Sequence, residues 1–162
     1  MQRIFDMSRY STRLGFSKYK IHEKGCGVVA LAEYLTFLSG ELVHPVELNQ
    51  ILVEHSGFMN GGEIWWLRVA QIFDLGHDIE LWNEQRGHID IKKKLFPAII
   101  SVDGLEIEGY QTHFVFGKGL MCRNEDILIS DPWDEDITSV MGYYNRGNIR
   151  ESVFSYVRFE VK

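Results

Sequence analysis

The feature that most constrains the fold is a change of hydrophobic pattern near residue 76, from helix-like to strand-like. Before it, long apolar runs and helix stop signals predict helices at 26–37, from Pro45 to the Ser56-Gly57 stop, and at 63–75 with Gly76 as the C′ residue. After it, β-rich runs between turn residues predict strands at 79–82, 98–102, 113–116, 127–129 and 153–161. Because helices fill one half and antiparallel strands the other, the sequence predicts an α+β fold.

The size and composition of the chain predict one domain spanning residues 1–162. At 162 residues and 45% hydrophobic content, the chain lies in the single-domain range and can bury a sizeable core. The net charge is −6 and no basic stripe is present, so nucleic acid is not expected as the main partner. No apolar stretch reaches the roughly 18 residues of a membrane span, and the N-terminus lacks a secretory signal, so we expect a cytoplasmic protein.

The sequence predicts neither a metal site nor a cofactor. The histidines and cysteines show no zinc-type spacing, and no glycine-rich phosphate loop occurs. The acidic cluster at 131–136 lacks the glycine and terminal glutamate of an EF-hand calcium loop. The two cysteines are too few for a disulfide framework, and Cys122 is expected to pack beside the hairpin that joins the strands at 113–116 and 127–129.

Cys26 is the first candidate for chemistry, because it stands at the predicted start of an apolar helix, between Gly25 and Gly27. The free N–H groups and the positive end of the helix dipole stabilise a thiolate at such a position. Flanking glycines let a substrate approach the backbone and expose amide donors for an oxyanion. A buried, inert cysteine is the alternative that helix position alone leaves open.

His113 and Asp131 are the two residues that favour a catalytic cysteine. His113 starts one predicted strand and Asp131 ends the next, and a hairpin between them can place those two ends side by side. A histidine beside a carboxylate can take the proton of a thiol, which is the arrangement of nucleophile, base and orienting group. Each residue alone also has a plain explanation, as a hydrogen-bonded histidine or as an Asp-Pro turn opener.

An ordered set of motifs resembles the peptidase C39-like family of papain-fold cysteine peptidases. The set includes Leu14-Gly15, Gly25-Cys26-Gly27, the helix after it, Val43 to Leu48, Gly61-Gly62, Phe96 to Ile100, His113-Phe114-Val115 and Ile129-Ser130-Asp131-Pro132. The resemblance implies a papain-like fold, in which an N-terminal helical lobe packs against a C-terminal antiparallel sheet. It also implies that Cys26 is the nucleophile, His113 the general base and Asp131 the orienting residue, acting on a peptide or protein substrate.

The chain departs from that family at one position. Members usually carry a glutamine upstream of the cysteine that helps to hold the oxyanion, whereas here Ile4 stands in register and Gln2 is displaced by two residues. The three site residues and the resemblance nevertheless predict a peptidase or amidase that works through a thioester. The alternatives are the same fold as a peptide- or protein-binding module with an idle triad, or an acyltransferase.

Two aromatic segments carry further expectations. Adjacent positions on a helix point about 100° apart, so one of Trp65 and Trp66 is expected in the core and the other in a cleft or at a partner surface. The segment from Tyr143 to Asn148 is expected to form an exposed loop.

Overall fold

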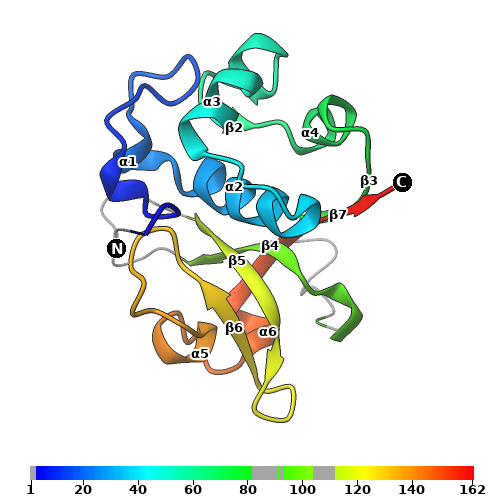
Figure 1. Ribbon diagram of the computed structural model, residues 1–162. Coiled ribbons are helices and arrows are strands. Elements are labelled where there is room, and N and C mark those ends of the chain that lie inside the picture. Colours follow the sequence, from blue (N-terminus) through cyan, green and yellow to red (C-terminus); the bar gives the residue numbers. More distant parts are fainter. Residues whose placement is uncertain (1–2, 82–90, 92, 104–111) are drawn as a thin grey trace.

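A computed structural model describes residues 3–81, 91, 93–103 and 112–162, and its helices and strands segregate along the chain (Figure 1). The first half holds the short helix η1 (Met7–Arg9) and then α1 (Ile21–Lys24), α2 (Cys26–Ser39), α3 (Pro45–Glu54) and α4 (Trp66–Ile72). Two short strands, β1 (Phe58–Met59) and β2 (Glu63–Ile64), pair between α3 and α4. The predicted α+β class is confirmed.

The second half forms an antiparallel sheet. Within the described residues, five strands pair in the order β3-β7-β4-β5-β6. These strands are β3 (Leu75–Leu81), β4 (Ala98–Asp103), β5 (Thr112–Met121), β6 (Asp126–Ser130) and β7 (Val153–Val161). The short helix η2 (Lys93–Leu95) precedes β4, while α5 (Val140–Tyr143) and α6 (Ile149–Ser152) lie between β6 and β7.

The sheet buries apolar side chains on both of its faces. Ile99 packs into the core that contains α2, whereas its neighbour Ile100 packs into a second core with residues of α5 and β6. Successive side chains of a strand point to opposite faces, so a strand covered on both sides is buried at successive positions and mostly apolar. This explains why residues 98–102 form an unbroken β-rich run. Ser101 is the buried polar residue of β4, and its hydroxyl hydrogen-bonds to the Ser155 hydroxyl.

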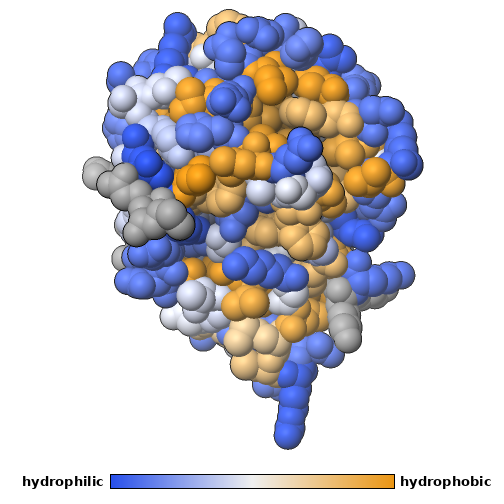
Figure 2. All heavy atoms as spheres, viewed as in Figure 1, coloured by the Kyte–Doolittle hydropathy of each residue, from blue (hydrophilic) through white to orange (hydrophobic). Residues whose placement is uncertain are grey.

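Helix α2 crosses the sheet and is buried from Cys26 through most of its length (Figure 1). Its Tyr34 hydroxyl donates toward the carbonyl oxygens of Phe159 and Pro97, at 3.0 and 3.1 Å, and accepts from the Phe159 amide at 2.9 Å. These bonds fix the helix to β7 and to the start of β4. On the face seen in Figure 2, apolar residues gather across the middle, where α2 crosses the sheet, and polar residues surround them.

The predicted helix at 63–75 is wrong at both ends. Asn60 and Gly61 have positive φ angles of 49° and 87°, and this turn pairs Glu63 and Ile64 with β1 instead of starting a helix. The helix itself spans only Trp66–Ile72, and Gly76 lies within β3 rather than at a helix C′ position. The predicted strand at 79–82 corresponds to the end of β3, with Trp82 outside the described residues.

Two other surface features differ from or extend the expectations. Cys122 was expected to pack beside the β5–β6 hairpin, but it is exposed at the tip, where Cys122, Arg123 and Asn124 all have positive φ angles. These three left-handed residues lie in the turn between β5 and β6, and the Cys122 side chain is on its surface. In the described ranges, no helix has both the length and the apolar character needed to cross a membrane.

Candidate functional site

The structure brings the three predicted site residues together. Cys26 is the first residue of α2, His113 is the second residue of β5, and Asp131 directly follows β6. Antiparallel pairing of β5 with β6 places the start of one strand near the end of the other. His113 Nε2 lies 2.9 Å from Asp131 Oδ1, and Cys26 is close enough to the same imidazole to affect its pKa.

The glycine before Cys26 is required by packing. A Cβ atom on Gly25 would lie 2.6 Å from the Ile21 carbonyl oxygen, which is closer than real contacts allow. The Gly25 amide donates to that same oxygen at 2.7 Å and closes α1. Glycine therefore lets α1 end directly against α2, and this places Cys26 at a helix N-terminus, where backbone N–H groups have no partner inside the helix.

The surroundings of the buried pair His113 and Asp131 favour the charged form of each residue. Burial alone would lower the pKa of His113, but its hydrogen bonds to Asp131 and Cys26 and their negative charge outweigh burial and raise the pKa of His113 to about 10. Burial would likewise raise the pKa of Asp131, yet the His113 partner, the Tyr144 hydroxyl and the Trp133 amide hold that pKa below its usual value. At neutral pH the site therefore holds an imidazolium and a carboxylate.

Tyr144 is a member of the site that sequence reasoning missed. Its hydroxyl donates to Asp131 Oδ2, while the Trp133 amide donates to Oδ1 at 2.8 Å, so both carboxylate oxygens are engaged. Its ring lies 5.8 Å from the His113 ring, and the residue is 5% exposed. Burial and the charge of Asp131 raise the pKa of Tyr144 far above its ordinary value, so the hydroxyl keeps its proton.

The expectation of an exposed loop at 143–148 is therefore wrong for Tyr144, although Tyr143 is 44% exposed. Helix α5, capped by the Ser139 hydroxyl, turns Tyr144 toward the sheet. Val140 and Tyr144 are both buried and are four residues apart, which is the spacing of one helix face. This four-residue spacing could have predicted from the sequence that Tyr144 is buried.

Replacing Tyr144 by phenylalanine is expected to lower the free energy of unfolding by about 1–3 kcal/mol, because it leaves a buried carboxylate oxygen without its donor. Urea denaturation measures the change. The matched control is Tyr143→Phe, which removes a hydroxyl from the exposed neighbour and should change stability by less than about 0.5 kcal/mol. Equal losses in the two variants would contradict the role of Tyr144.

A second polar chain holds Asp131 in place from the other side. Ser130 donates to Glu33 Oε2 of α2 at 2.7 Å, and Arg3 donates to the same Ser130 hydroxyl at 2.7 Å. The Met7 amide also donates to the Pro132 carbonyl oxygen at 2.8 Å. These contacts attach the end of β6 to α2 and to the N-terminal segment, and so they fix the backbone on both sides of Asp131.

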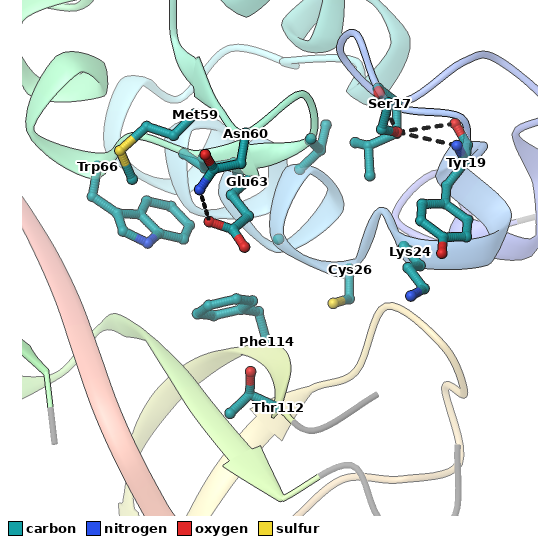
Figure 3. A pocket seen from close by; sticks show the side chains of 15 residues that line it. Ser17, Tyr19, Lys24, Cys26, Met59, Asn60, Glu63, Trp66, Thr112 and Phe114 are labelled. Atoms are coloured by element: carbon teal, nitrogen blue, oxygen red, sulfur yellow. Dashed lines mark hydrogen bonds between the residues drawn. The ribbon is translucent and has the colours of Figure 1, made fainter. Parts of the chain in front are cut away.

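A pocket of about 600 Å³ opens beside Cys26 (Figure 3). Cys26 itself is 3% exposed, but it forms part of the pocket wall. Leu14, Ile64, Trp66 and Phe114 give the pocket apolar walls, and Lys24 and Glu63 are its charged residues among those described. Trp66 is half-buried and lines the pocket, whereas Trp65 is 43% exposed, so neither indole is fully in the core.

The segment in which the C39-like family usually carries a glutamine lies partly outside the described residues. Gln2 is not described, while the carbonyl oxygen of Ile4 accepts a hydrogen bond from the Tyr10 hydroxyl at 2.5 Å.

In the described portion of the chain, no three His, Cys, Asp or Glu side chains are arranged to hold a metal ion. No protein-family model and no curated protein matches this chain.

Proposed function

We propose that this protein is a cysteine hydrolase that cleaves a peptide or other amide bond, with a papain-like fold of the C39-like kind. The observation that carries the proposal is the series of contacts from Cys26 through His113 to Asp131, with Cys26 in the wall of a pocket. The helix-then-sheet order and the position of the cysteine at the start of the long helix support the fold assignment.

The proposed reaction begins with a Cys26 thiolate paired with the His113 imidazolium. The sulfur attacks the carbonyl carbon, and the carbonyl oxygen becomes an oxyanion that the Cys26 backbone N–H can stabilise at the start of α2. Asp131 engages Nε2, so Nδ1 is the nitrogen that gives its proton to the leaving amine as the C–N bond breaks. The acyl group remains on sulfur as a thioester.

Water completes the cycle. His113, now neutral, takes a proton from water, the hydroxide oxygen attacks the thioester carbonyl, and the C–S bond breaks to release a carboxylic acid. The thiolate and the imidazolium are then restored. Asp131 orients the ring throughout and stabilises its charged form, while Tyr144 and the Trp133 amide keep the carboxylate in position.

Alkylation of Cys26 tests the ion pair directly. We expect iodoacetamide to modify Cys26 faster than Cys122 at pH 6–7, because the proposed imidazolium partner stabilises a thiolate. The rate should then change again only near pH 10, where His113 loses its proton. Mass spectrometry of the modified peptides measures the rate at each pH.

Cys122 is the internal control, since it is exposed and free. His113→Ala should slow the alkylation of Cys26 at pH 6–7 to the rate of Cys122 or below it. Matching profiles for the two cysteines in the unmodified protein would sink the proposed ion pair. Early alkylation of Cys26 without any peptide cleavage would instead favour the binding-module alternative.

A further inference from the structure

On one side of the pocket, aromatic side chains and a carboxylate lie close together. Trp66 and Phe114 meet edge to face, with ring centroids 5.5 Å apart, and Met59 lies beside them (Figure 3). Figure 3 shows the Glu63 side chain directed into the same space, above Phe114. The hairpin of β1 and β2 positions Glu63, and Asn60 Nδ2 donates to Glu63 Oε2 at 3.1 Å.

Glu63 is an exposed residue of the pocket wall, so its carboxylate is open to a partner from solution. Among the residues that the structure describes, no lysine or arginine forms an ion pair with Glu63. The other charged residue of the pocket, Lys24, lies on the opposite side of Cys26 in Figure 3, where its ammonium stacks 4.1 Å from the centre of the Tyr19 ring. The pocket is therefore negative at one end and positive at the other.

A ligand side chain with a positive charge at the end of an apolar stem fits these features of the pocket. The methylene groups of such a side chain can pack on Met59, Trp66 and Phe114, while its charge reaches the carboxylate and the faces of the aromatic rings. An acidic side chain would be repelled by Glu63 at this end. A neutral apolar side chain would fill the space but leave the carboxylate without a partner.

We infer that Glu63 is a specificity-determining residue and that the substrates are peptides with lysine or arginine close to the bond that Cys26 attacks. This inference rests on the proposed hydrolase, because it assigns the side chain that the pocket accepts next to the nucleophile. The binding step can nevertheless be measured without catalysis, so the two proposals can fail separately.

The binding experiment uses the Cys26→Ala protein and three acetylated, amidated hexapeptides of alanine that carry lysine, norleucine or glutamate at the third position. Norleucine has the stem of lysine without its ammonium group. By NMR titration, we expect the lysine peptide to bind about tenfold more tightly than the norleucine peptide, and the glutamate peptide to bind most weakly.

Substitutions at Glu63 assign the preference. Glu63→Gln in the same protein should remove the difference between the lysine and norleucine peptides, and Glu63→Lys should make the glutamate peptide the tightest of the three. The matched control is Glu41→Gln, which removes the same charge from an exposed position after α2 and should leave the tenfold preference intact.

Equal binding of the lysine and norleucine peptides, no binding of any of the three, or a preference that survives Glu63→Gln would each overturn the inference. Cleavage is measured separately, with the unmodified protein and the lysine peptide. A Glu63-dependent preference without cleavage would refute the hydrolase and leave the binding specificity standing. Cleavage of all three peptides at equal kcat/KM would refute the specificity and leave the hydrolase standing.

Discussion

Replacing Cys26 by alanine is expected to reduce peptide cleavage by about 10⁴-fold or more, because no thioester can then form. His113→Ala should cause a loss of similar size, since the thiol would lose its base and the leaving amine its proton donor. The double variant should be little worse than either single variant, because residues that act as one unit are not additive. Mass spectrometry of a peptide-library digest measures the cleavage.

The second cysteine supplies the control for this experiment. Cys122→Ala removes an exposed thiol at the tip of the β5–β6 hairpin and should leave kcat/KM unchanged. Cleavage that persists in Cys26→Ala would show that another group, or another protein in the sample, performs the reaction. Circular dichroism of each variant establishes that the fold is retained.

Asp131→Ala is expected to produce the largest loss of stability, about 3–5 kcal/mol in the free energy of unfolding. The substitution leaves the His113 imidazolium fully buried without its carboxylate partner, and it also removes the acceptor of the Tyr144 and Trp133 donors. A loss of this size is a large fraction of the stability of a typical domain. Urea denaturation at pH 7 measures it.

Asp131→Asn keeps the variant measurable if Asp131→Ala does not fold, because the amide oxygen can still accept one hydrogen bond. Its loss should lie between those of Asp131→Ala and Tyr144→Phe. Asp136→Ala removes an exposed aspartate from the same loop and should cost less than about 0.5 kcal/mol. If Asp131→Asn were as mild as Asp136→Ala, the buried pair would contribute little to the fold.

Local patterns in the sequence predicted the parts of the molecule that depend on nearby residues. The apolar run after Cys26 predicted α2, and the β-rich segments predicted the strands, because each pattern reports the period of one element. The hairpin between β5 and β6 is also local, so the approach of His113 to Asp131 could be foreseen.

The remaining features depend on contacts between distant segments. Ser130 meets Glu33 and Arg3 across 97 and 127 residues of sequence, and no local pattern specifies such partners. The start of the predicted helix at 63–75 was wrong for another reason: turn geometry at Asn60 and Gly61 places Glu63 and Ile64 in a strand and outweighs the helical spacing that follows. The position of Glu63 in the wall of the pocket depends on that same turn.

The hydrogen bonds of Tyr34 have a consequence for the position of the Cys26 sulfur. Tyr34 lies eight residues after Cys26, or about 12 Å along the axis of α2, and its hydroxyl fastens the helix to two strand ends. Translation or rotation of the helix would move the sulfur relative to the imidazole, which sits on the sheet. The position of the sulfur relative to the imidazole is thus controlled by a fully buried phenol two turns away along the helix.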